Sequence, residues 1–221
     1  MTVYYKVTNL DGAAYHDGHG RWTLGRWRSV RGPLVACQRG LHLCTADQLV
    51  DWLGPVIWKA EASGEVLYAG DKMVTRRARI VCRVETWNER TARLFAADCA
   101  ERVLPLFEAQ YPTDDRPRKV IEVARRFANG EATEKELAAA EAAEAATRDA
   151  AVTAGVAAGA AAWAAVAAGV AGAAEAAEAA RAARAAARAA EAAGAADRAA
   201  AWDAERKWQT ERLMEILGER A

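Results

Sequence analysis

The chain has 221 residues, with 30 Lys or Arg and 30 Asp or Glu, so its formal net charge is zero. This length can hold two small domains, and the balance excludes a strongly basic or strongly acidic protein. The charge is uneven, because residues 1–88 carry 12 basic and 8 acidic side chains, whereas residues 89–221 carry 18 and 22. Either the two halves attract each other, or the first half meets an anionic partner, with nucleic acid as a weak candidate.

The N-terminus shows no apolar run after a basic start, so we expect no signal peptide. The four cysteines, Cys37, Cys44, Cys82 and Cys99, are scattered among apolar neighbours. This pattern is typical of reduced thiols rather than of a disulfide framework. We therefore predict a cytoplasmic location.

The first 88 residues predict a small mixed β-sheet domain. Val3–Thr8 is rich in β-branched and aromatic residues and indicates a strand, followed by a turn at Asn9–Gly12. Two short apolar runs at residues 34–37 and 41–44 flank another turn. The capping-box pattern of residues 45–48 predicts a helix over residues 46–53. Further strands are predicted at residues 56–62, 65–68, 73–75 and 79–86.

Residues 13–32 form a polar loop that mixes arginine with tryptophan, a combination suited to stacking and to phosphate contact. The alternative is a long surface loop whose tryptophans pack back on the sheet. From this loop and the following strand we take five candidate contacts for a ligand or partner: Arg21, Trp22, Trp27, Arg28 and His42.

Cys37, His42 and Cys44 are the residues closest to a metal-ligand set. Their spacing lacks a Cys-x-x-Cys pair, so we predict no metal and favour buried thiols beside a hydrogen-bonded histidine. The chain also lacks a glycine-rich phosphate loop, a Gly-x-Ser-x-Gly elbow and a His-Glu-x-x-His motif. We therefore predict no cofactor and no catalytic residue.

The second half predicts helices throughout. One runs from about Glu89 to Leu104, where Pro105 ends or kinks it, and another follows Arg116-Pro117 and stops at Asn129-Gly130. A second capping box at residues 133–136 then opens an alanine-rich region, Ala138–Ala201. Alanine has the highest helix propensity, so this region is predicted to be helical.

Within the alanine-rich region the polar stripe drifts around the helix, and small side chains allow close packing. We place turns near residues 155–159 and near Gly194, which predicts an antiparallel helical bundle. A single long rod and a membrane span over residues 151–174 are the alternatives. Trp163, Trp202 and Trp208 are expected to fill gaps between helices, or alternatively to form a stacking platform. The closing helix is predicted at residues 197–217, with an Asp203–Lys207 pair.

Several stretches of the first half stand out: Tyr4-Tyr5-Lys6, Cys37-Gln38-Arg39-Gly40-Leu41-His42-Leu43-Cys44, Glu61-x-x-Gly64-Glu65 and Gly70-Asp71-Lys72. Together they resemble an uncharacterised N-terminal domain of phage and actinobacterial proteins. In the second half, residues 91–102 and Arg116-Pro117-Arg118 resemble an alanine-rich helical family of immunity proteins of polymorphic toxin systems. This resemblance implies a protein that acts by binding a partner. Residues 40–45, before a helix, are similar to the strand–turn–helix of ADP-ribosyltransferase-like folds, which would make Glu85 the catalytic glutamate.

The sequence thus predicts an α+β fold: a small mixed β-sheet domain, residues 1–88, followed by an alanine-rich antiparallel helical bundle, residues 89–221. We expect a non-enzymatic interaction protein, of the immunity or phage counter-defence kind, that binds a protein partner or a small anionic ligand. The first alternative is a nucleotide-binding or ADP-ribosyltransferase-like enzyme, with Tyr5, His42 and Glu85 lining a cleft. The second is a structural helical assembly. The oligomeric state is left open.

Overall fold

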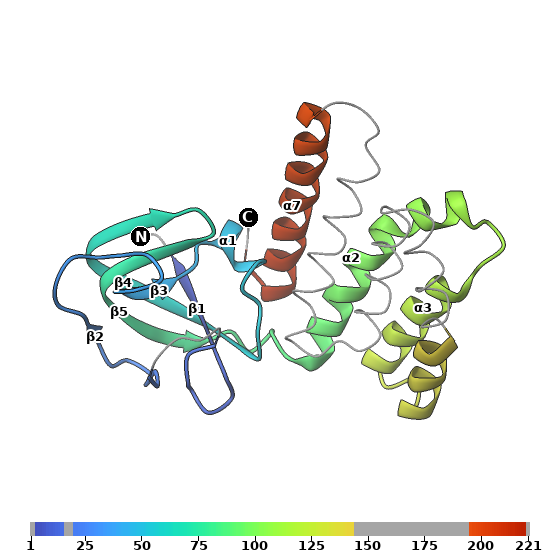
Figure 1. The fold of residues 1–221 in the computed structure, drawn as a ribbon. Coiled ribbons are helices and arrows are strands. Elements are labelled where there is room, and N and C mark those ends of the chain that lie inside the picture. Colours follow the sequence, from blue (N-terminus) through green and yellow to red (C-terminus); the bar gives the residue numbers. More distant parts are fainter. Residues whose placement is uncertain (1–2, 16–19, 144–194, 220–221) are drawn as a thin grey trace.

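The computed structural model describes residues 3–15, 20–143 and 195–219. An antiparallel sheet built from residues 4–83 precedes a set of helices, which confirms the predicted α+β class (Figure 1). The predictions for the turns at residues 155–159 and Gly194, for Trp163, for the membrane span and for the bundle of residues 144–194 lie outside the described residues. Along the described helices, none has an apolar stretch long enough to cross a bilayer.

The sheet contains five strands: β1 (Tyr4–Thr8), β2 (Arg28–Ser29), β3 (Leu41–Leu43), β4 (Val56–Ala69) and β5 (Lys72–Arg83). Its order is β1-β4-β5-β2, with β3 also paired to β5, and every pair is antiparallel. β4 and β5 form a long hairpin around Gly70 and Asp71 (Figure 1). Each of these two strands was predicted as two shorter pieces. The break predicted in β4 coincides with a β-bulge between Ser63 and Val66, which bends the strand without ending it.

The sheet closes on itself through a short contact between β1 and the residue after β3. The Tyr5 N–H donates to the Cys44 carbonyl at 2.8 Å, and the Cys44 N–H donates back to Tyr5 at 2.9 Å. Because β3 also pairs with β5, the strands form a circuit from β1 through β4, β5 and β3. The circuit surrounds one apolar cluster, made of Ala14, Trp22, Leu41, Leu43, Ala60, Met73, Ala78 and Ile80.

The predicted helix after Thr45 is present but short, because α1 spans only Ala46–Leu49. The Thr45 N–H donates to the Gln48 side-chain oxygen at 3.1 Å, as a capping box requires. Turns replace the helix at residues 50–52, and the buried Leu53 follows them. The capping residues therefore determine where α1 begins, whereas its end at Leu49 was not predicted.

The second half begins with α2 (Glu89–Gln110) and α3 (Arg116–Ala128), and residues 134–143 are also helical. Pro105 does not end α2, which continues to Gln110. Proline has no N–H to donate to the carbonyl four residues earlier, which belongs to Glu101. Both residues lie on the exposed side of the helix, where a water molecule can donate to that carbonyl instead. The Thr133 capping box is confirmed, since the Thr133 N–H donates to Glu136 at 2.8 Å.

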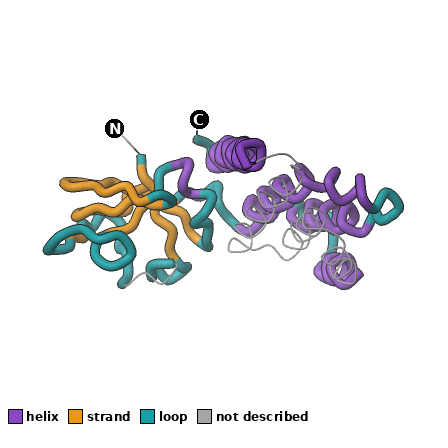
Figure 2. Tube along the Cα trace, turned by 45° about the horizontal axis from the view of Figure 1, so that its top comes forward, coloured by secondary structure: helices purple, strands orange, loops and turns teal. Residues whose placement is uncertain are grey.

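The last helix, α7 (Ala195–Leu217), lies between the sheet and the other helices (Figures 1 and 2). Its Leu213, Met214 and Leu217 are buried in a second apolar cluster. This cluster also contains residues from β1, α1 and α2, so it crosses the predicted boundary at residue 88. Its largest fully buried members include Trp87, Phe95, Phe107, Leu49, Leu53, Ile57, Leu104 and Leu213.

Ion pairs from α7 reinforce this packing. Asp98 of α2 accepts from Arg125 of α3 at 2.6 Å and from Arg212 of α7 at 2.7 Å. Glu205 of α7, only 4% exposed, pairs with Arg102 of α2 at 2.6 Å. The predicted Asp203–Lys207 pair is wrong, because Lys207 instead faces Glu211 at 3.9 Å. An exposed lysine can pair with an acid on either neighbouring turn, so its local spacing does not decide between them.

Candidate functional site

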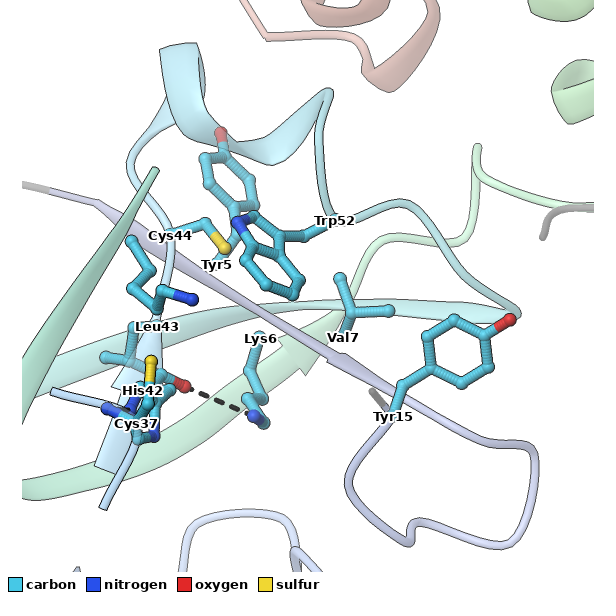
Figure 3. Close-up of a pocket in the computed structure, with 10 residues that line it drawn as sticks. Tyr5, Lys6, Val7, Tyr15, Cys37, His42, Leu43, Cys44 and Trp52 are labelled. Atoms are coloured by element: carbon cyan, nitrogen blue, oxygen red, sulfur yellow. Dashed lines mark hydrogen bonds between the residues drawn. The ribbon is translucent and has the colours of Figure 1, made fainter. Parts of the chain in front are cut away.

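A cavity of about 270 Å³ lies where β1 and β3 separate (Figure 3). The aromatic side chains of Tyr5, Tyr15 and Trp52 form part of its wall, and none of its described lining residues is acidic. The described lining residues are Tyr5, Lys6, Val7, Tyr15, Cys37, His42, Leu43, Cys44, Trp52 and Lys72. All ten residues belong to the first 88 residues of the chain.

The cavity exists because the pairing between β1 and β3 stops after a single residue pair. In the antiparallel register set by Tyr5 and Cys44, the next hydrogen-bonded pair would be Val7 and His42. Their carbonyls instead find other donors: Lys6 Nζ lies 3.2 Å from the His42 oxygen, and the Tyr15 N–H lies 3.5 Å from the Val7 oxygen. The two strands are therefore free to diverge without leaving these acceptors unsatisfied.

Lys6 places a buried ammonium group at the site. Its side chain belongs to a residue only 8% exposed, and burial lowers its pKa to about 8, with the charge of Arg28 acting in the same direction. The Trp22 ring centre lies 5.3 Å from Lys6 Nζ and 4.9 Å from the Arg28 guanidinium carbon. The electron-rich ring thus compensates part of the positive charge gathered here.

His42 is held in place by the loop before it. The Cys37 N–H donates to His42 Nε2 at 3.1 Å, and Cys37 has a left-handed backbone with a φ of 63°. An accepting Nε2 assigns the proton of the neutral ring to Nδ1. Burial lowers the pKa of His42, and the positive charges of Lys6 and Lys72 lower it further. His42 is therefore neutral near pH 7 and supports the loop.

The cysteines of the site show no metal arrangement. Cys44 is buried, and burial raises the pKa of its thiol to about 12, whereas Cys37 is exposed. Across the described ranges no group of three or more His, Cys, Asp or Glu side chains could hold an ion. All four cysteines of the chain are described, and all are free thiols.

Lys72 and Trp52 form the side of the cavity next to the β4–β5 turn. Lys72 Nζ lies 4.4 Å from the Trp52 ring centre and 3.4 Å from an Asp71 carboxylate oxygen. The indole N–H of Trp52 donates to the Asp71 carbonyl at 2.6 Å. The turn thereby orients both a flat aromatic face and an ammonium group at the cavity wall.

Three of the five predicted contact residues lie together, because the Arg28 guanidinium carbon is 4.9 Å from the Trp22 ring centre and Arg28 donates to the Arg21 carbonyl at 3.2 Å. The five differ in how accessible they are. His42 lines the cavity, whereas Trp22 is buried inside the sheet circuit at 7% exposure. Arg21 is exposed and pairs with Asp11 at 2.6 Å. Trp27 and Arg28 are half-buried beside β5, so the tryptophans of this loop do pack against the sheet, while its arginines remain partly accessible.

The alternative set of Tyr5, His42 and Glu85 is also divided. Tyr5 and His42 line the cavity, but Glu85 is exposed and lies 3.5 Å from Arg83. Our sequence reading missed Lys6, Tyr15, Trp52 and Lys72 as lining residues. Lys6 offered a signal, because a lysine in the middle of an apolar strand must either face solvent or be specially accommodated.

Comparison with known proteins identifies the helical half. The chain matches the family model described as "Imm-5 like putative immunity protein" over residues 83–216, which contain α2, α3 and most of α7. No match was found among curated proteins or among solved structures. Residues 1–82, with the cavity, lie outside the match. Because the match covers more than half of its length, the chain belongs to the Imm-5 like family.

Proposed function

We propose that this protein confers immunity by binding a protein toxin directly, without catalysing a reaction. Membership of the Imm-5 like family supports the immunity role. The proposal includes a cytoplasmic location, which the four free thiols favour because reduced cysteines are typical of that compartment. A phage counter-defence protein would also act by binding, so identification of the partner distinguishes the two roles.

The observation that carries the proposal is an arginine–tryptophan surface where β2 meets β5. We define it by Trp27, Arg76, Arg77 and Arg79. β2 pairs with β5 so that Arg28 stands opposite Ala78 and Ser29 opposite Arg77. The Trp27 ring centre then lies 4.6 Å from the Arg77 guanidinium carbon and 4.8 Å from that of Arg79. Stacking of this kind holds the long arginine side chains in place before a partner arrives.

The charge of this surface favours an acidic partner. Arg76 pairs with Glu65, and Arg79 pairs with Glu61, but both glutamates remain partly exposed. Arg77 is exposed and has no carboxylate partner among the residues that the structure describes. Tryptophan and arginine are also the residues most often responsible for binding energy at protein interfaces. We therefore place the toxin contact here, against a carboxylate-rich surface of the toxin.

The test is co-expression with each toxin domain encoded next to this gene. We expect cell growth to be rescued by one of them, and the purified pair to co-elute in size-exclusion chromatography. The double variant Trp27→Ala/Arg77→Ala should weaken binding by about 30-fold, as expected for the loss of an interface hot spot. The matched control is Arg118→Ala on α3, which removes an exposed arginine far from the surface and should bind normally.

Two results would overturn the proposal. If the intact chain neither rescues growth nor binds any neighbouring toxin, the immunity mechanism is wrong. If it binds but the double variant binds equally well, the toxin contacts another surface, and the arginine–tryptophan surface loses its assigned role.

A further inference from the structure

We propose that the cavity between β1 and β3 binds a small aromatic anion, consisting of one ring with a carboxylate or phosphate group. Lys6 and Lys72 would hold the anionic group, and Trp52 with Tyr5 and Tyr15 would contact the ring. This inference does not depend on the toxin-binding proposal, because Trp27 and Arg77 do not line the cavity. It assigns a second site to the domain that the family match leaves out.

The first argument is the charge of the lining. Among the described lining residues there are two lysines and no carboxylate, and His42 is neutral there. An ammonium has three donors, and the one hydrogen bond that Lys6 makes to the described residues goes to the His42 carbonyl. A buried charge is stable when it is paired, so an anion entering the cavity would supply the missing partner.

The second argument is the aromatic wall. Figure 3 shows the Trp52 and Tyr5 rings next to one another above the Lys6 chain, with the Tyr15 ring on the side beyond Val7. Lys72 Nζ already lies over the Trp52 ring, at 4.4 Å from its centre. A flat ligand can therefore contact aromatic surface while its anionic group remains near both ammonium groups. Ligand sites commonly combine an apolar lining with a few polar groups in this way.

The third argument is size. A cavity of about 270 Å³ is near the lower end of the range for small-molecule sites, which is roughly 300 to 1,000 Å³. This volume suits a single ring with its anionic substituent and excludes full enclosure of a dinucleotide. The proposed ligands are accordingly smaller than the nucleotides that the sequence analysis considered.

The test is isothermal titration calorimetry of the full chain with four probes. Phenyl phosphate and benzoate carry both ring and anion, benzamidine has the ring with a positive charge, and inorganic phosphate lacks the ring. We expect phenyl phosphate or benzoate to bind at least about tenfold more tightly than benzamidine and inorganic phosphate, since a charge-assisted contact and ring burial each favour them. Preference between the first two probes distinguishes a phosphate ligand from a carboxylate ligand.

Variants locate the binding. Lys6→Met should lower the affinity for the tighter-binding probe by about tenfold. Lys72→Gln should do the same, because each substitution removes one ammonium group. The matched control is Lys119→Gln on α3, an exposed lysine paired with Asp115, which should leave affinity unchanged. Quenching of tryptophan fluorescence that disappears in Trp52→Phe would place the ring independently of the lysines.

Three results would overturn the proposal. The first is the absence of measurable binding by both ring anions to the folded intact chain. The second is equal binding of benzamidine and benzoate. The third is a Lys6→Met chain that is folded, by its circular dichroism, and retains full affinity. None of these results bears on toxin binding, so the two proposals succeed or fail separately.

Discussion

Arg206 of α7 lies 2.8 Å from the Asp51 carboxylate, and its guanidinium also donates to the Asp47 carbonyl at 3.0 Å, 159 residues away in the chain. These contacts attach the last helix to the segment around α1. Both side chains of the ion pair are mostly shielded, at 29% and 18% exposure. The pair is therefore less screened by water than a surface ion pair.

Arg206→Gln should lower the free energy of unfolding by about 1 to 2 kcal/mol, because it removes the ion pair with the mostly shielded Asp51 carboxylate. Urea denaturation measures this loss. Lys207→Gln is the control on the next residue, where the side chain is 79% exposed and the pair to Glu211 is loose at 3.9 Å. Equal effects of the two substitutions would show that the Arg206 contacts do not stabilise the fold.

Leu213→Ala should destabilise the whole molecule by about 2 to 5 kcal/mol, the usual cost of a cavity in a packed core. Leu213 is fully buried in the cluster shared by the sheet half and the helical half. We therefore expect a single cooperative transition to move to lower urea concentration, as seen by both circular dichroism and tryptophan fluorescence. Leu10→Ala, at an 82% exposed position, should change little. Loss of the helical signal alone would contradict the shared core.

Lys6→Met should make the protein less sensitive to pH between 7 and 9. Burial lowers the pKa of Lys6 from 10.5 to about 8, so between those values the unfolded chain holds a proton that the folded chain has lost. Stability from this group therefore rises with pH across that window, by about 1 kcal/mol between pH 7 and 9. The buried Cys44 thiol, whose pKa is raised from 9.0 to about 12, acts in the opposite direction above pH 9.

The measurement is the difference in unfolding free energy between the intact chain and Lys6→Met at several pH values. Taking the difference removes the contributions of titratable groups that Lys6 does not influence, whereas Cys44 and His42, whose pKa values the charge of Lys6 lowers, still contribute to it. The free energy of unfolding of the intact chain should increase relative to that of Lys6→Met as pH rises from 7 to 9. A difference that stays constant with pH would mean that folding does not lower the pKa of Lys6.

Gly40→Ala should destabilise the turn before β3 by about 2 to 3 kcal/mol. A Cβ at Gly40 would overlap the Cγ1 atom of Val74 on β5, and the backbone there has a φ of 150°. Gly64→Ala is the matched control, because Gly64 also has a positive φ, of 84°, but nothing lies within 4 Å of the added carbon. Its cost should be only the conformational one, about 1 kcal/mol, as measured by thermal unfolding. Similar losses at both positions would rule out the overlap as the cause.

The division at residue 88 remains a prediction, and truncation tests it. Residues 1–88 by themselves would expose Leu49, Leu53, Ile57 and Trp87, which α2 and α7 help to bury. We therefore expect the isolated segment to aggregate or to bind a hydrophobic dye, and addition of the remaining chain in trans to reverse this. A soluble and cooperatively folding segment would instead establish it as an independent domain.

Local signals predicted most of the described elements. β1 was readable from its aromatic and β-branched residues, α3 from its early proline and final Asn129-Gly130, and the helix after Thr133 from its capping box. The same signals did not predict that α2 continues to Gln110 beyond Pro105, or that β4 continues through its bulge. At Pro105 the unpaired carbonyl faces water, and at the bulge β4 keeps its pairing with β5 on both sides. The spacing of residues in the sequence reveals neither.

The sequence by itself determined the α+β class, the starts of the helices and the composition of the loop with its arginines and tryptophans. These features depend on neighbours within a few residues, through backbone propensity, capping and side-chain alternation. Only the tertiary structure decided that Lys6, His42, Trp52 and Lys72 surround one cavity and that α7 returns to the sheet. The cause is the separation of β1 from β3 after Tyr5 and Cys44, a contact between residues 39 positions apart that no local pattern encodes.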